Sequence, residues 1–426
     1  MICSPILKAS LAGLLALAAS TAAPVQAQGI RASFDCAKAE RAVDRFICAH
    51  AVLRWQDLAM SSSYAAARAM TQGAAREELL RGQRDWLRER DRRCIADRSF
   101  KELAAPSGEL AKQAYDCLNV LYLGRRQVLQ DRVAKPLAPE NTAQLDLTAI
   151  AKERPELLEK SQPRIASMEA SPDGSVLAAF LPSLELDLPD QVWLYRVADG
   201  KWLAATPTPD QQATHPDNSP AALNAWAWKG DTLYVRLAVW SASNAGEQMK
   251  TVVYAATPDA SRRLDEPPRD IVDRLDAASQ MSTIEPGELP ESDQDALDNM
   301  KSNRDFLVWS HDLGHGTIEL RMRKRASEAA TYTVAWGSWL LWRYLFDAQR
   351  SQLIYSADTG ITVFHMATRA ERRIAGTSAG DQPQAVSADR RLFIWSTRNQ
   401  CGDELLVEQD MDAPERYCIA SLNGRR

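Results

Sequence analysis

The sequence predicts a multidomain α plus all-β protein, in which a small disulfide-stapled helical domain is followed by a β-propeller-like domain. Three observations predict this fold class: helical periodicity between residues 31 and 130, four cysteines in the same segment, and a turn-then-strand repeat after residue 165. With 426 residues the chain exceeds the usual length of one domain, and 45% apolar residues suffice for a sizeable core.

Residues 1–27 have the pattern of a signal peptide. Lys8 precedes an apolar run over 11–19, and the small residues of Val25-Gln26-Ala27 predict cleavage after Ala27. The apolar run is too short to span a bilayer, and no later stretch reaches about 18 apolar residues, so we predict no membrane span. We therefore expect the mature protein to be periplasmic or secreted.

Apolar residues recur at helical spacing throughout 31–130, and no strand pattern interrupts them. Gly73 and a Pro- and Gly-containing turn at 105–108 separate the helical stretches. The pattern predicts helices at about 39–48, 52–70, 74–93 and 109–130.

Six of the seven cysteines follow the signal, and an even number in an exported chain favours disulfides. Four of them lie in the helical segment and allow three pairings. We expect the pairs Cys36–Cys48 and Cys94–Cys117, because each closes a short local loop, and Cys401–Cys418 would pin a C-terminal hairpin. Zinc binding is disfavoured because the pairs lack the short spacing of zinc ligands.

Four prolines punctuate 131–165, which we expect to be a linker with one short helical piece near 145–152. Across 166–426 aromatic and β-branched residues become frequent, and ten of the twelve tryptophans lie there. An acidic, Pro-containing insertion at about 259–305 separates two parts of this β-rich segment.

A turn followed by a strand recurs in the β-rich segment. The unit is clearest at 171–180, with similar units at 228–235, 347–355 and 387–395 and a weaker one at 306–309, and second strands follow at 192–202, 251–255, 362–366, 416–420 and 317–322. Units of roughly 40 residues with paired strands are typical of propeller blades. The stretches "SPDG" and "LYRVADGKW" are similar to TolB-like periplasmic propellers. A β-sandwich or an irregular stack of hairpins is the alternative fold.

No catalytic motif is present, neither GxSxG nor HExxH nor a phosphate-binding loop, so we predict no catalytic, cofactor-binding or metal-binding residues. His311 and His315 are clustered, but Gly314 and Gly316 favour a polar hairpin turn over a metal site. The tryptophans could line a carbohydrate groove, because aromatic faces stack on sugars. Their spacing on predicted strands favours packing instead.

Gln83, Trp86 and Arg90 lie on one stripe of a predicted helix, by their i, i+3, i+7 spacing. Because Trp and Arg are common anchors of interfaces, this stripe is the candidate partner-binding site. In the alternative interpretation, Trp86 is a core residue and the other two lie at the core's edge and pair with acidic residues.

Charge is distributed unevenly between the two predicted domains. Residues 29–130 contain 18 Lys and Arg against 13 Asp and Glu, whereas the chain after 130 contains 32 basic and 43 acidic residues. The helical domain is therefore basic and the rest of the chain acidic, and this difference in charge affects which partners each part can bind.

The four cysteines of the helical segment belong to a longer pattern that includes QRDWLRERDRRC over 83–94. The pattern reads Cys36…Ile47-Cys48…Leu53…Asp57-Leu58…Tyr64…Gln83-Arg84-x-Trp86-Leu87-x-x-Arg90-Asp91-x-x-Cys94…Cys117-Leu118…Tyr122…Arg125. Over about 31–130, this pattern resembles the N-terminal domain of LprI-type lysozyme inhibitors. The resemblance implies a helical, disulfide-bonded domain and a lysozyme or another cell-envelope protein as partner.

An inhibitor needs no catalytic residues, only a surface that covers the enzyme's cleft, so we expect a binding protein that is not an enzyme. It would use no cofactor and no nucleic acid, and the β domain would be an interaction platform. One alternative is an envelope assembly or scaffold protein whose basic domain binds anionic wall polymer or lipid headgroups. A further alternative is an enzyme with its site in the channel of the β domain.

Overall fold

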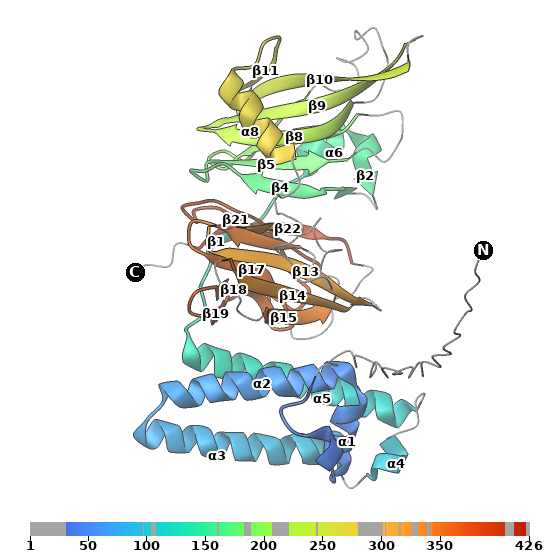
Figure 1. The fold of residues 1–426 in the computed structure, drawn as a ribbon, viewed down its shortest axis with the longest axis vertical. Helices are drawn as coiled ribbons and strands as arrows, with labels where there is room; N and C mark the ends of the chain where they lie inside the picture. Colours follow the sequence, from blue (N-terminus) through green and yellow to red (C-terminus); the bar gives the residue numbers. More distant parts are fainter. Residues whose placement is uncertain are drawn as a thin grey trace, which may run out of the picture.

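The computed structural model describes residues 31–96, 98–103, 108–159, 162–182, 189–206, 221–243, 246–279, 301–302, 304–314, 317–325, 331–338, 341, 343–404 and 413–422. The expected signal peptide lies outside the described residues. The molecule is elongated, with a helical domain at one end and a β-rich region stacked along the long axis beyond it (Figure 1).

The helical domain consists of a few long helices around one apolar core. Its elements are η1 (Cys36–Lys38), α1 (Ala42–Ala49), α2 (Ala51–Met70), α3 (Gly73–Arg90), the π-helical turn η2 (Asp91–Ile95), α4 (Phe100–Leu103) and α5 (Glu109–Val133). The four predicted helices are confirmed, and the short α4 was not predicted. Phe46, Ile47, Leu53, Leu118 and Leu129 are fully buried in the core, at the apolar positions that the periodicity indicates.

Three disulfides join the pairs that the spacing favoured. Cys36–Cys48 and Cys94–Cys117 close loops within the helical domain, and Cys401–Cys418 closes one in the β-rich region. The Cys94–Cys117 bond ties η2 to α5, so the end of α3 is held against the longest helix of the domain.

In the described residues, the β-rich region contains five four-stranded antiparallel sheets, which we number 1 to 5. Sheet 1 contains β4 (Ser167–Ala170), β5 (Val176–Leu181), β6 (Gln191–Arg196) and β7 (Lys201–Ala204), and sheet 2 contains β8 (Ala221–Lys229), β9 (Thr232–Ser243), β10 (Gly246–Thr257) and β11 (Ala260–Leu264). Sheet 3 contains β12 (Lys301–Ser302), β13 (Phe306–Gly314), β14 (Thr317–Lys324) and β15 (Tyr332–Ser338), and sheet 4 contains β16 (Tyr344–Asp347), β17 (Gln352–Ala357), β18 (Gly360–His365) and β19 (Ala370–Arg373). Sheet 5 contains β20 (Gln382–Val386), β21 (Phe393–Thr397), β22 (Arg416–Ser421) and β1 (Glu140–Gln144).

The repeated turn that the sequence indicates has the same geometry in two sheets. In sheet 1, the hydroxyl of Ser171 accepts a hydrogen bond from the Val176 amide at 3.0 Å and donates one to Asp173. In sheet 5, Ser387 Oγ accepts from the Leu392 amide at the same distance. The two turns are also in contact, since a Cβ added at Gly174 would lie 2.8 Å from Ser387 Oγ. Only glycine fits this position, where φ is +71°.

The segment 131–165 contains more than a linker. α5 continues into it, and β1 pairs with β22, so these residues complete sheet 5. The rest forms α6 (Thr148–Glu153), η3 (Pro155–Leu157) and a two-stranded hairpin of β2 (Leu158–Glu159) and β3 (Gln162–Pro163). Every residue of β1 is exposed, so the strand carries no apolar alternation from which it could have been predicted.

Apolar clusters connect the sheets in the order 2, 1, 5, 4, 3. One cluster joins sheets 2 and 1, a second joins sheets 1 and 5, a third joins sheets 5 and 4, and a fourth joins sheets 4 and 3. Within the described residues no closed propeller is detected, so the predicted propeller is confirmed only as several small antiparallel sheets.

Helix α8 (Arg269–Ser279) lies within the predicted insertion and covers one face of sheet 2. Ile271 and Leu275 are each 1% exposed and pack on Ala225 and Val253. Because residues alternate between faces along a strand, this face is opposite to the one that packs on sheet 1. A helix therefore occupies the place that a neighbouring blade would take in a closed ring.

The helical domain packs against the β-rich region through α2 and α5 (Figure 1). Gln56 Nε2 donates to Asp358 Oδ2 at 2.8 Å, and Arg126 lies 3.9 Å from the same carboxylate. The rings of Trp55 on α2 and Trp336 on β15 have centroids 5.8 Å apart. The two parts of the molecule are therefore in direct contact.

A second group of polar contacts lies at the end of α5. Gln130 Nε2 donates to Glu371 at 2.9 Å, and Asp131 forms an ion pair with Arg373 at 3.3 Å. Arg373 and Gln130 are 4% and 8% exposed, so the contact excludes most of the water. Buried, paired polar groups of this kind fix one relative orientation, because any shift leaves them without partners.

Candidate functional site

Two residues of the predicted binding stripe face the core of the helical domain. Gln83 is 7% exposed; its amide nitrogen contacts the sulfur of Met60 on α2, and its oxygen accepts from Arg125 Nε on α5 at 2.9 Å. Gln83 thus connects α3 to both neighbouring helices.

Arg90 is 2% exposed and belongs to a chain of buried polar groups. Its Nη1 donates to the hydroxyl of Tyr122 at 2.7 Å, and that hydroxyl donates to Asp57 Oδ1 at 2.9 Å. The other oxygen of Asp57 accepts from the amide of Ser33, and Arg90 Nε donates to Asp91. The chain joins α3, α5 and α2 to the segment before α1.

The hydroxyl of Tyr122 stays protonated within this chain. Burial raises the pKa of Tyr122 well above its ordinary value, and the charge of Asp57 acts in the same direction, although Arg90 opposes both. The hydroxyl can therefore donate to Asp57 while it accepts from Arg90, which is the arrangement that the distances require.

Trp86 packs on the same cluster from its edge. Its ring lies 5.4 Å from that of Tyr122 in an edge-to-face arrangement, and the guanidinium of Arg90 lies 5.7 Å from both ring centroids. Trp86 is half-buried, whereas Gln83 and Arg90 are buried. The burial is the reverse of the alternative interpretation, which made Trp86 the core residue and put the other two at the core's edge; only its pairing of Arg90 with an acidic residue, Asp91, agrees.

The role of the stripe in partner binding stays a prediction. Trp86 is the member with an accessible edge. Gln83 and Arg90 would act on a partner only through the helices whose positions they fix. Asp57 and Tyr122, which complete the network, are polar residues within apolar helical stretches, and the sequence pattern did not single out their contact.

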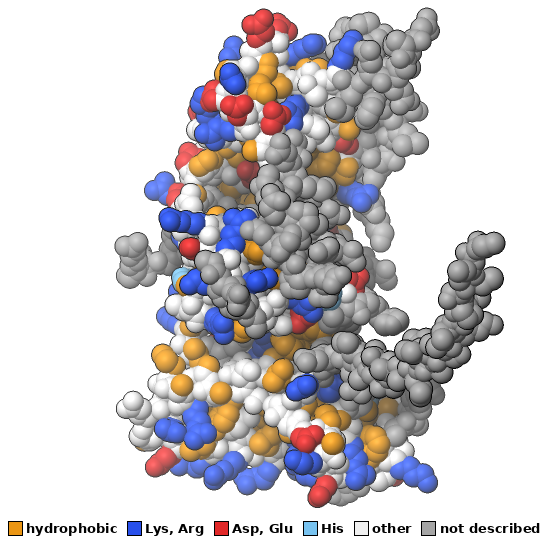
Figure 2. Space-filling model, viewed as in Figure 1, with side chains coloured by type: hydrophobic (Ala, Val, Ile, Leu, Met, Phe, Trp, Pro, Cys, Tyr) orange, Lys and Arg blue, Asp and Glu red, His pale blue; other side chains and the backbone are white. Residues whose placement is uncertain are grey.

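The outward face of α3 carries four arginines, Arg81, Arg84, Arg88 and Arg92, counting the start of η2. Their spacing of three or four residues puts them on one side of the helix, and all four are exposed. Figure 2 shows basic side chains gathered at this end of the molecule. Arg88 pairs with Asp85 and Arg92 with Glu89, so the face is basic with acidic residues interspersed.

Since α2 and α5 face the β-rich region, the opposite side of the helical domain is the one open to a partner (Figure 1). This side includes the outer face of α3. The i, i+3, i+7, i+11 spacing of its arginines was visible in the sequence but was not used.

No group of three or more His, Cys, Asp or Glu side chains in the described ranges is arranged to hold a metal ion. His311 lies on β13 opposite Glu319, and His315 lies outside the described residues. None of the described helices has both the length and the apolar composition needed to cross a membrane.

The solved structures that resemble this chain do so too weakly to show a shared fold. The isopeptidase AtxE2 with bound Astexin3-dC4 is 12% identical, covers 62% of this chain and 39% of its own, and has a TM-score of 0.27. Chaetomium thermophilum Sqt1, bound to the N-terminus of a ribosomal protein, is 14% identical, covers 55% of this chain and 82% of its own, and has a TM-score of 0.25. This chain thus spans well under half the length of the isopeptidase. TM-scores this low do not establish that two proteins share a fold. No curated protein matches the chain.

The helical domain, by contrast, matches a known family. Residues 35–129 match the family described as lysozyme inhibitor LprI. The match begins just before Cys36 and ends within α5, so it includes both disulfides of the domain and the polar network of Arg90, Tyr122 and Asp57. The N-terminal part of this chain, over residues 35–129, is therefore an LprI-type domain.

Proposed function

We propose that this protein is an exported binding protein whose helical domain inhibits a lysozyme by covering the cleft of the enzyme. The observation that carries the proposal is the match of residues 35–129 to the lysozyme inhibitor family. The three disulfides support an oxidising compartment, either the periplasm or the medium. In this proposal the protein binds its target and catalyses no reaction.

The side of the helical domain that faces away from the β-rich region is the proposed contact surface. It offers the outer face of α3 and the accessible edge of Trp86. The β-rich region, with five sheets of the size of propeller blades and a last sheet completed by β1, would serve as a rigid second platform.

The test is a titration of lysozyme activity on bacterial cell walls with the full mature chain. We expect saturable inhibition. We also expect the double variant Arg84→Glu with Arg88→Glu to change the inhibition constant, because it reverses two charges on the proposed contact surface. The matched control is Arg262→Glu with Arg263→Glu on β11, which changes charge equally on the far side of the molecule. Absence of inhibition at large excess would contradict the proposal.

The arginine face of α3 favours a second candidate, an envelope scaffold protein that binds anionic wall polymer or lipid headgroups. Exposed arginines attract such polyanions, and the attraction weakens as salt screens it. Cosedimentation with purified cell walls tests this function. Binding that falls steeply with salt, and that the Arg84→Glu, Arg88→Glu variant abolishes, would support the scaffold over the inhibitor.

A further inference from the structure

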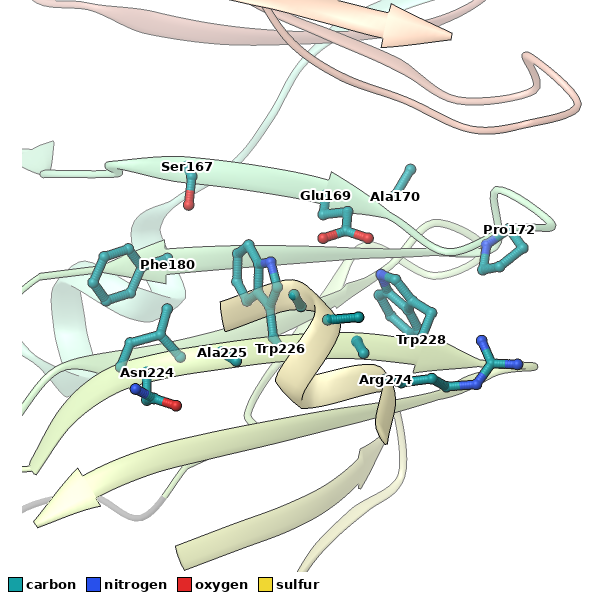
Figure 3. Close-up of a pocket in the computed structure, with 14 residues that line it drawn as sticks. Ser167, Glu169, Ala170, Pro172, Phe180, Asn224, Ala225, Trp226, Trp228 and Arg274 are labelled. Carbon is teal, nitrogen blue, oxygen red and sulfur yellow. The ribbon is translucent and has the colours of Figure 1, made fainter. Parts of the chain in front are cut away.

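A cavity of about 750 Å³ lies between sheets 1 and 2, at the edge strands β4 and β8, with α8 as a third wall. This volume is in the range of sites that hold small organic ligands. The lining residues include Phe180, Trp226 and Trp228 as aromatic groups and Glu169, Asn224 and Arg274 as polar ones. Figure 3 shows the two tryptophans side by side on β8, with Glu169 across from them on β4.

The two tryptophans have one residue between them and therefore lie on the same face of β8. The Phe180 ring meets that of Trp226 edge-to-face at 6.4 Å. A β-bulge between Leu223 and Ala225 places Asn224 at the cavity, where its side-chain oxygen accepts from Arg236 Nε at 2.6 Å. Bulges of this kind re-aim side chains next to binding sites.

One donor in the wall of the cavity has no partner. Trp228 is 7% exposed, and its indole N–H makes no hydrogen bond among the described residues. In Figure 3 the indole nitrogens of both tryptophans face the strand that carries Glu169. Trp226 hydrogen-bonds to Glu169, whereas the N–H of Trp228 is left for another group. A buried donor without a partner costs free energy that a bound acceptor would recover.

The third wall is firmly held in place. Lys229 Nζ forms an ion pair at 2.7 Å with Asp270 near the start of α8, and Arg236 Nη2 donates at 3.2 Å to the carbonyl of Leu275 in the middle of the helix, so α8 is tied to sheet 2 at two places. These contacts hold α8 on sheet 2 in the absence of a ligand, and a wall that is already in place lowers the entropic cost of binding.

We propose that this cavity binds a saccharide, whose ring stacks on the half-buried Trp226 and whose hydroxyl groups bridge the free N–H of Trp228 and the carboxylate of Glu169. An organic cation could sit among aromatic rings beside a carboxylate, but it carries no acceptor for the Trp228 N–H. A hydroxyl both donates and accepts, so it satisfies the two groups together. This proposal is independent of what the helical domain binds.

The test is titration of the full mature chain with cellotriose, maltotriose and triacetylchitotriose, followed by tryptophan fluorescence and calorimetry. We expect saturable binding of at least one trisaccharide. Trp228→Phe keeps the ring and removes the donor, and it should weaken binding by about tenfold. Above about pH 7, where Glu169 is ionised, Glu169→Gln should weaken it as well, since it replaces the charged acceptor with a neutral one.

The matched control is Trp202→Phe on β7, which also removes an indole donor but lies outside the cavity lining. It should leave affinity unchanged. If Trp228→Phe fails to fold, Glu169→Gln decides the result. The proposal is overturned if no trisaccharide binds at millimolar concentration, if Trp202→Phe weakens binding as much as the cavity variants do, or if tetramethylammonium binds in preference to every trisaccharide.

Discussion

The helical domain and the β-rich region are held together by different kinds of interaction. In the helical domain, a buried polar chain through Arg90, Tyr122 and Asp57 and two disulfides fix how the helices meet. In the β-rich region, ladders of backbone hydrogen bonds and apolar clusters between sheets perform this task, with one disulfide at the C-terminal end. The helical domain should therefore respond more to the loss of single bonds, and the β-rich region to changes in its apolar faces.

The largest expected difference concerns the disulfides. Replacement of both Cys94 and Cys117 by Ser should destabilise the helical domain by about 2–5 kcal/mol, because the bond closes a loop between η2 and α5. Loss of helix on heating, followed by far-UV circular dichroism with and without reductant, measures the effect. A helical transition that reductant does not shift would contradict the comparison.

A smaller effect is expected from the polar chain. Tyr122→Phe removes the hydroxyl that connects Arg90 to Asp57, and because both partners stay buried it should cost about 1–3 kcal/mol. Chemical denaturation of the full chain gives the difference. Tyr64→Phe, at a half-buried tyrosine of α2, is the control and should change stability by much less. Equal effects at the two positions would show that the chain has no special role.

The smallest effect concerns Glu169 in the β-rich region, where burial raises the pKa from 4.5 to about 7 even though Trp226 opposes the shift. Between these pH values the folded state holds a proton that the unfolded state has lost, so stability should decrease as pH rises from 4.5 to about 7 and then level off. The side chain keeps partial exposure, and we expect a loss of about 1 kcal/mol.

Glu169→Gln has no titratable group at this position and should lack that decrease. Thermal unfolding of both proteins across this pH range gives the comparison. Stability that rises with pH in the wild-type chain relative to the variant would refute the assignment.

The sequence predicted the elements whose local pattern is strong. Helical periodicity located α2, α3 and α5 within a few residues, and the turn at 171–174 located β5. It could not predict β1, which has five exposed residues and is a strand only because β22 lies beside it. It also did not predict α8, since the segment at about 259–305 was interpreted only as an acidic, Pro-containing insertion, with no helix assigned in it.

In the candidate sites, too, the sequence predicted what depends on local spacing and missed what depends on contacts between distant segments. Spacing correctly put Gln83, Trp86 and Arg90 on one stripe, but the direction of that stripe depends on Tyr122 and Asp57, which come from two other helices. The cavity draws on β4, β5, β8 and α8, segments up to about a hundred residues apart, so no local pattern could have assembled it.

The pairing of β1 with β22 also sets an order for folding. Glu140 lies opposite Ser421, so sheet 5 cannot be completed until nearly the whole chain is available. The disulfides of the helical domain join residues only 12 and 23 positions apart, and such local contacts form early. As synthesis proceeds from the N-terminus, the helical domain can fold first, while residues 140–144 have no strand to pair with until β22 is available. A chain that ends before residue 416 would thus lack β22 and would leave the edge of β21 open to pairing with other molecules.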